Sequence, residues 1–74
     1  MATYPTPSGK QVVNALRKLG FTVVRIHGSH YMMKRAGSPL IPVPVHRNEP
    51  IADGTLRNII RKAGLTPEEF YRVV

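Results

Sequence analysis

Two prolines, Pro42 and Pro44, constrain the fold of this chain more than any other feature. They lie in residues 40–45 (Leu-Ile-Pro-Val-Pro-Val), whose remaining side chains are typical of a β-strand. Proline has no backbone N–H, and residues two apart present their N–H groups to the same side of a strand. One side of this strand therefore cannot pair with a neighbour. The pattern predicts an edge strand that pairs only through its other side and resists edge-to-edge aggregation.

Two further strands are predicted before this edge strand. Residues 21–27 and residues 29–35 are rich in β-branched, aromatic and long apolar side chains, and Gly28 separates them. Glycine adopts positive φ at little cost, so Gly28 suits a sharp reversal between two antiparallel strands. We therefore expect His30 to lie at the start of the second strand, on a rigid element.

Amphipathic helices are predicted on both sides of the strands. Residues 9–19 carry apolar side chains at helical spacing, Ser8 and Gln11 match a capping box, and Gly20 provides a stop. A second helix is predicted from Asp53, its expected N-cap, to Gly64. A last short helix begins with a second capping box, and its residues are Thr66, Pro67, Glu68 and Glu69.

The order helix, three strands, helix, short helix predicts an α+β fold. We expect a three-stranded antiparallel sheet with the helices packed on one face. This α-β-β-β-α order is also that of the double-stranded-RNA-binding domain, here with a short extra C-terminal helix. At 74 residues the chain suits one domain, predicted over residues 8–74, behind a flexible tail of residues 1–7.

The charge of the chain favours a polyanionic partner. Eleven Lys and Arg face four Asp and Glu, giving a net charge of +7, and residues 1–48 contain no acid. Such an excess suits a nucleic acid, and the alternatives are a charge that serves solubility alone or a surface that binds an acidic protein. The absence of cysteine excludes disulfides and thiolate metal sites and permits the cytoplasmic location that we expect. No apolar run approaches the ~18 residues of a membrane span, so no membrane partner is expected.

Several short motifs occur together along the chain, and they are Leu19-Gly20-Phe21, Arg25, Gly28-Ser29-His30, Val43-Pro44-Val45-His46, Gly54-Thr55-Leu56-Arg57-Asn58-Ile59-Ile60 and Ala63-Gly64-Leu65. In this order and at these spacings they resemble the HicA toxin family, the small mRNA-cleaving partners of HicB antitoxins. The likeness covers about residues 8–70. One departure is Met33, where the family commonly has an aromatic residue.

The resemblance implies a metal-independent endoribonuclease toxin with His30 as its catalytic residue, neutralised by a HicB-type antitoxin. RNA carries its own nucleophile, the 2′-hydroxyl, and a histidine exchanges protons near neutral pH. Gly28, Ser29 and His46 are candidate supporting residues, and His46 is equally well explained as the end of an edge strand. Cations beside the histidine would contact phosphate, and the candidates are Arg25, Lys34, Arg35 and Arg47.

His27 and His30 also form an H-x-x-H pair, a pattern that can indicate zinc. Residues three apart on one strand point to opposite faces, and no cysteine or carboxylate cluster lies nearby in the sequence. We therefore expect neither a metal site nor a small-molecule cofactor.

Two alternatives to the nuclease interpretation stay open from the sequence. The first is a non-catalytic RNA-binding domain of the same fold, and the second is an interaction protein whose basic face binds an acidic partner. Cleavage of RNA by the isolated protein distinguishes the nuclease from both.

Overall fold

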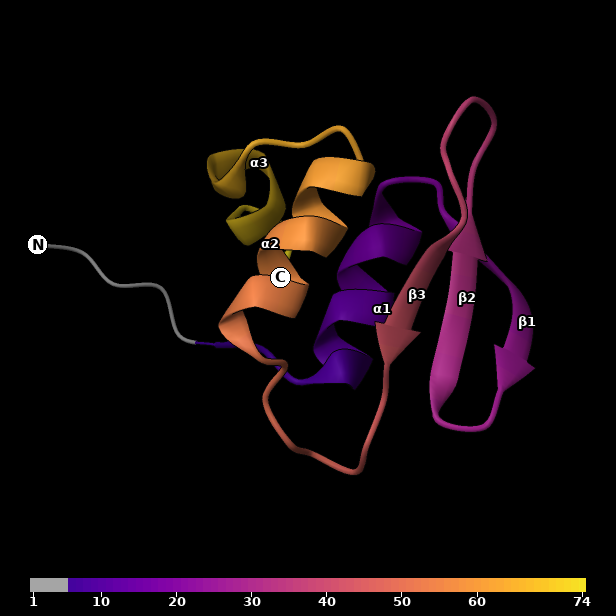
Figure 1. Cartoon of the computed structure of the whole chain (residues 1–74). Helices are drawn as coiled ribbons and strands as arrows, with labels where there is room; N and C mark the ends of the chain where they lie inside the picture. The colour runs from indigo at the N-terminus through magenta and orange to yellow at the C-terminus, as the bar shows by residue number, and fades with distance from the viewer. Residues whose placement is uncertain (1–5) are drawn as a thin grey trace, which may run out of the picture.

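In the computed structural model, which describes residues 6–74, the chain runs from a helix through three strands to two further helices (Figure 1). This order confirms the α+β fold predicted from the sequence and is that of the double-stranded-RNA-binding domain. The elements are α1 (Gly9–Lys18), β1 (Thr22–His27), β2 (His30–Lys34), β3 (Ile41–Pro44), α2 (Asp53–Lys62) and α3 (Pro67–Tyr71).

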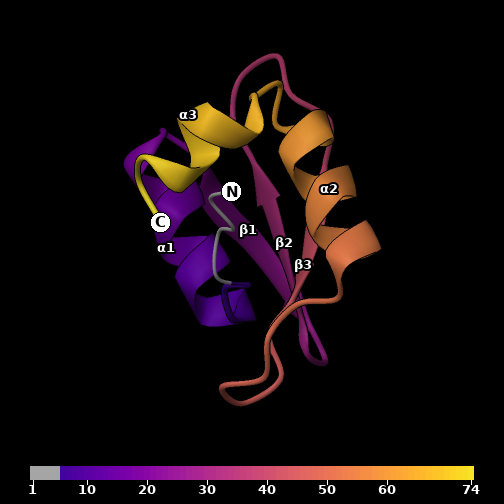
Figure 2. The same cartoon turned by 90° about the vertical axis from the view of Figure 1, so that its left-hand side faces the viewer.

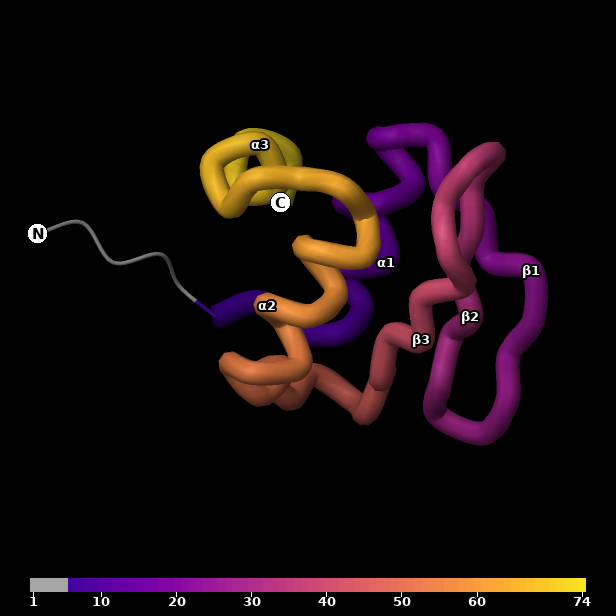
Figure 3. Tube along the Cα trace, turned by 45° about the horizontal axis from the view of Figure 1, so that its top comes forward, coloured from indigo at the N-terminus to yellow at the C-terminus, as the bar shows by residue number. Residues whose placement is uncertain are grey.

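The sheet is antiparallel in the order β1-β2-β3, which places β3 at an edge as the prolines predicted. Just past β3, the Val45 N–H donates to the Ser29 carbonyl at 2.7 Å. By alternation, the N–H groups of Ile41 and Val43 point to that same side, toward β2. The positions that lack an N–H therefore face outward. The helices lie on one side of the sheet in every view (Figure 1, Figure 2 and Figure 3).

The core lies between this helix layer and the sheet. Met33 is fully buried, at the position where the family that the sequence resembles commonly has an aromatic residue. Burying an apolar side chain of this size stabilises the fold by about 1.5–3 kcal/mol relative to leaving it exposed. The largest fully buried side chains come from all layers, and they are Phe21, Phe70, Leu16, Met33, Ile41, Val12 and Val43.

The helix ends follow the local signals in the sequence. At the start of α1 the Ser8 N–H donates to Gln11 Oε1 at 2.9 Å, and the Gln11 N–H donates to Ser8 Oγ at 3.3 Å. At its end Gly20 has φ of 93°, and the Phe21 N–H donates to the Leu16 carbonyl at 3.0 Å. These bonds form the predicted capping box and a Schellman motif.

The ends of α2 and α3 are also set by local signals, with one correction. Asp53 is the first residue of α2, and its N-cap is Ala52, which makes no side-chain bond. The expectation that Asp53 caps this helix is therefore wrong; instead its carboxylate pairs with Arg57 one turn later at 2.8 Å. In α3 the predicted capping box forms, and the hydrogen bond from the Thr66 backbone N–H lowers the pKa of the Glu69 carboxyl.

The first turn of α1 packs directly against the end of β3. The Ile51 N–H donates to the Pro7 carbonyl at 2.9 Å, and a Cβ added to Gly9 would lie 2.0 Å from the Pro44 carbonyl oxygen. Pro7 is buried, so it belongs to the folded part, whereas residues 1–5 of the predicted tail lie outside the described residues. This close contact fixes the position at which the chain leaves β3.

Within residues 6–74, no helix combines the length and the apolar content needed to cross a membrane.

Candidate functional site

The turn between β1 and β2 is fixed by its own geometry and by a bond from the next strand. Gly28 has φ of 62°. Within residues 6–74, positive φ occurs at four glycines and at Arg47, so Ser29, the second residue of the turn, does not have it. Positive φ at the first central position alone matches a two-residue type II′ turn. The Ser29 carbonyl accepts the bond from Val45, so β3 also holds this turn. His30, the first residue of β2, therefore starts from a constrained backbone.

His30 lies on the face of the sheet that points away from the helices. Residues directly opposite each other in an antiparallel ladder point to the same face. His30 pairs with His27 on β1 and with Pro44 on β3, whereas Met33 and Ile41, on the other face, are fully buried under the helices. We call the exposed side the open face, and the register assigns to it Thr22, Arg25, His27, His30, Met32, Lys34, Pro42 and Pro44.

A β-bulge at Val24 places Arg25 on the open face. The register shifts between Val23 and Arg25, so that Val23 pairs with Met33 while Arg25 pairs with Met32. Without the extra residue, Val23 and Arg25 would share a face, because side chains two apart on a strand point the same way. The bulge lets Val23 pack against the core while Arg25 and His27 face outward.

The structure corrects the expected placement of the two histidines. His27 and His30 are not three residues apart on one strand; they flank the two-residue turn and pair directly across the ladder. Their side chains therefore share the open face instead of pointing apart. Within residues 6–74, no group of three or more His, Cys, Asp and Glu side chains is placed to hold a metal ion.

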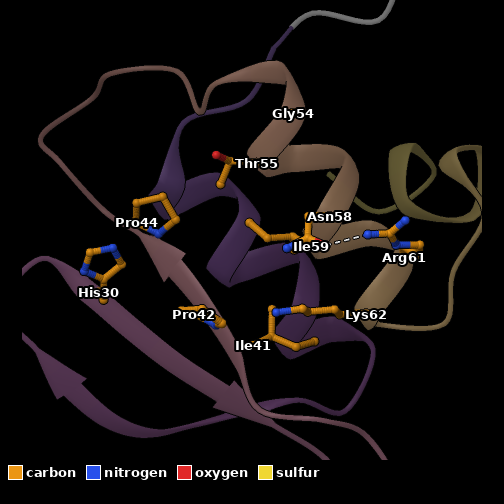
Figure 4. A pocket seen from close by; sticks show the side chains of 10 residues that line it. All are labelled: His30, Ile41, Pro42, Pro44, Gly54, Thr55, Asn58, Ile59, Arg61 and Lys62. Atoms are coloured by element: carbon orange, nitrogen blue, oxygen red, sulfur yellow. Dashed lines mark hydrogen bonds between the residues drawn. The ribbon is translucent and has the colours of Figure 1, made fainter.

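A groove of about 690 Å³ begins at His30 and runs between the outer edge of β3 and α2 (Figure 4). His30 lies beside Pro44 at one end, and Arg61 and Lys62 lie toward the other. No acidic residue lines it, and the Arg61 guanidinium donates to Asn58 Oδ1 at 3.0 Å. With Arg61 and Lys62 in its lining and no acidic residue, the groove is positively charged. Its lining comprises His30, Ile41, Pro42, Pro44, Gly54, Thr55, Asn58, Ile59, Arg61 and Lys62.

The α2 residues of this groove were not predicted from the sequence. Thr55, Asn58 and Lys62 are spaced three and four residues apart, which places them on one helix face beside the buried stripe. This spacing of polar residues could have predicted that the three side chains lie on one surface of the helix. Only the packing of α2 against the edge of β3, however, brings the surface next to His30.

The four cations predicted to contact phosphate fall in different places. Arg25 and Lys34 are exposed on the open face, and the Lys34 ammonium donates to the Ser38 carbonyl. Arg47 is exposed in the loop after β3, which reaches the same end of the molecule as the β1–β2 turn (Figure 1, Figure 2). His46 is also exposed in this loop, and its carbonyl accepts the Glu49 N–H at 3.1 Å.

Arg35, by contrast, is held inside the fold. Its guanidinium donates to the Leu19 carbonyl at 2.8 Å and to the Ala63 carbonyl at 3.4 Å. It also lies over the Phe21 ring, 4.5 Å from the centroid. These contacts join the C-terminal ends of α1 and α2 to the sheet. These contacts indicate a structural role for Arg35.

Comparison with known proteins assigns the chain to a protein family. A search of curated protein sequences found no significant match to the chain. The family described as "HicA toxin of bacterial toxin-antitoxin" matches residues 9–65, which is more than half of the chain and includes the hairpin, the open face and α2. The protein therefore belongs to the HicA toxin family, the toxins of bacterial toxin–antitoxin systems.

Proposed function

We propose that this protein is a metal-independent endoribonuclease that cleaves mRNA in the cytoplasm and is neutralised by a HicB-type antitoxin. The observation that carries this proposal is the position of His30. An exposed imidazole lies at a rigid turn, on a face that bears Arg25 and Lys34, at the mouth of a positively charged groove. The family assignment supports the toxin role.

His30 would act on the nucleophile that RNA itself supplies. The imidazole accepts the proton of the 2′-hydroxyl as the 2′-oxygen attacks phosphorus, and the bond from phosphorus to the 5′-oxygen breaks while that oxygen takes up a proton. The products are a 2′,3′-cyclic phosphate and a fragment with a 5′-hydroxyl. This scheme requires no metal and no small-molecule cofactor.

The cations near His30 would bind and orient the phosphate backbone. Arg25 lies on the same face as His30, two residue pairs further along the ladder, and Lys34 lies on that face at the other end of β2. Arg47 in the loop after β3, together with Arg61 and Lys62 in the groove, extends the positive surface. Charge-assisted bonds to phosphate oxygens fix the register of the RNA without reading its bases.

The backbone of the turn would support this chemistry. Gly28 allows the reversal, and the bond between Ser29 and Val45 ties the turn to β3. Reaction geometry depends on a rigid support, because small displacements of a catalytic group cost large factors in rate. His46, in the loop that Val45 begins, stays a candidate supporting residue.

A non-catalytic RNA-binding domain is the second candidate function. The observation that favours it is the open face itself, since contact between an exposed basic surface and the RNA backbone needs no proton transfer. In that case His30 would contribute to binding alone.

The variant His30→Ala separates the two functions. Loss of a positioned acid–base group lowers a rate by about 10²–10⁴-fold. Because His30 is exposed, stability should change by no more than about 0.5 kcal/mol, and RNA affinity should stay near that of the parent. Cleavage is followed with and without a chelator, and the ends of the fragments are identified.

The matched control is Ile26→Ala, which changes the same hairpin on the opposite face. Ile26 pairs with Tyr31 and is 56% exposed. This control should cleave at the parent rate. A folded His30→Ala protein that also cleaves at the parent rate would refute the catalytic assignment. A parent protein that binds RNA but leaves it intact, after the antitoxin is removed, would favour the binding domain.

A further inference from the structure

We infer that His27 is a second catalytic residue of this site, the general acid that protonates the 5′-oxygen as it leaves. This inference rests on the proposed ribonuclease function. It arises from the direct pairing of His27 with His30 across the β1–β2 ladder.

The hairpin holds the two imidazoles side by side. They occupy the last position of β1 and the first of β2, and only the Gly28-Ser29 turn separates them. Directly opposite residues have Cβ atoms about 4.5–5.5 Å apart on the same face. Both side chains are exposed, so a phosphate approaching the open face meets two rings instead of one.

Cleavage by the 2′-hydroxyl requires two proton transfers at opposite sides of phosphorus. His30 takes the proton from the 2′-oxygen while the bond from that oxygen to phosphorus forms. The bond from phosphorus to the 5′-oxygen breaks, and protonated His27 gives its proton to that oxygen, which leaves as a hydroxyl. His30 ends protonated and His27 neutral, and exchange with water restores both.

No other side chain of the open face can supply this second proton as readily. Arg25, next to His27 on the same face, does not release a proton in proteins. Lys34 lies four residues along β2 from His30, with its ammonium bonded to the Ser38 carbonyl. The open face contains no acidic residue, and its remaining members, Thr22, Met32, Pro42 and Pro44, exchange no proton near neutral pH.

His46 carries the third imidazole of the chain, but the sheet does not hold it opposite His30. It follows β3 by two residues in a loop, whereas His27 is locked opposite His30 by the ladder. The structure therefore favours His27 as the partner of His30 in the reaction.

The test compares two leaving groups. The scissile site is first mapped on unmodified RNA, and an oligoribonucleotide with sulfur in place of the 5′-oxygen at that phosphate is then prepared. A thiolate leaves without a proton, because thiols are far stronger acids than alcohols. His27→Gln should cleave the natural RNA about 10²–10⁴-fold more slowly than the parent, but the sulfur substrate at nearly the parent rate.

Two variants complete the experiment. His30→Ala should be slow on both substrates, since the 2′-hydroxyl still needs a base. Ile26→Gln, which alters the neighbouring position on the other face of the hairpin, should match the parent on both. Circular dichroism of each variant verifies that the fold is retained.

Distinct results would overturn the inference. If His27→Gln cleaves natural RNA at the parent rate, or if its defect is equally large on the sulfur substrate, His27 is not the general acid. If the parent protein cleaves neither substrate, the proposed function itself fails, and this inference fails with it.

Discussion

Arg25 and Arg35 are the same residue type with the same predicted role, yet their surroundings differ. Arg25 is exposed on the open face. Arg35 is half-buried, donates to two carbonyls and covers the Phe21 ring. Guanidinium groups suit both tasks, because they bind phosphate as a planar fork and also stack on aromatic rings. Only the contacts distinguish a binding residue from a structural one.

Arg25→Gln and Arg35→Gln should therefore have opposite effects. Arg25→Gln should weaken RNA affinity and reduce the slope of log K against log salt by about 0.7, the contribution of one contact to single-stranded RNA. Its free energy of unfolding should stay within about 0.5 kcal/mol of the parent. Arg35→Gln should lower the free energy of unfolding by about 1–3 kcal/mol, through lost charged hydrogen bonds and ring contact.

Each variant serves as the control for the other, measured by denaturant unfolding and by RNA titration at several salt concentrations. If a folded Arg35→Gln protein shows a reduced slope of log K against log salt, Arg35 contacts RNA after all. An Arg25→Gln protein with an unchanged slope would remove Arg25 from it.

At the scale of elements, the position of the hairpin depends on how α1 meets β3. Gly9, in the first turn of α1, lies against the backbone of Pro44 and Val45, and the Val45 N–H in turn holds the Ser29 carbonyl. The chain from α1 through β3 to the turn is thus one continuous set of contacts. Backbone atoms cannot move aside as a flexible side chain can, so a side chain at position 9 must displace an element.

Gly9→Ala should accordingly destabilise the protein. Its Cβ would meet the Pro44 oxygen at 2.0 Å and the Val45 Cα at 2.8 Å, and overpacking of this kind costs about 1–3 kcal/mol. The matched control is Gly54→Ala in the first turn of α2, where a Cβ meets nothing within 4 Å. That control should stabilise the protein by about 0.5–1 kcal/mol, because alanine loses less backbone freedom in a helix.

Thermal and denaturant unfolding of the two variants measures these changes. Equal stability of Gly9→Ala and the parent would show that α1 and β3 are not held in the close contact described above.

Acidic residues are confined to the C-terminal third of the molecule, whereas basic residues occur along the whole chain. The four acidic residues all lie within residues 49–74, whereas the open face is built from residues 22–44 and carries cations without acids. Asp53 pairs with Arg57 on α2, where both side chains are largely exposed. A protein antitoxin that masks the open face would therefore meet one sign of charge, and complementary charge also speeds its association.

We accordingly expect an acidic HicB-type antitoxin to cover the open face and the α2 groove. Hydrogen exchange of the complex should show protection of amides in the β1–β2 turn and in the first turn of α2. Single-stranded RNA should compete with the antitoxin for the His30→Ala protein, and higher salt should slow association. Full inhibition without protection at the turn would instead indicate that the antitoxin acts from a distance.

The elements and the features that depend on near neighbours along the chain could be predicted from the sequence. Both predicted capping boxes, the stops at Gly20 and Gly64, the turn at Gly28 and the edge position of β3 are as predicted. Each capping box or glycine signal works through bonds within about five residues, and the edge position follows from N–H groups that proline lacks. Residue types a few positions apart therefore suffice to predict these features, although a signal of the same kind placed the N-cap of α2 wrongly at Asp53.

Contacts between side chains that are distant in the sequence could not be predicted and are known from the fold. The bulge at Val24 reverses the face of Arg25, and pairing across the turn brings His27 beside His30. Arg35 bonds to carbonyls 16 and 28 residues away, and the groove requires α2 to pack beside β3. These outcomes depend on strand register and on the packing of distant segments. A one-residue shift in register, such as the bulge between Val23 and Arg25, moves every later side chain to the other face.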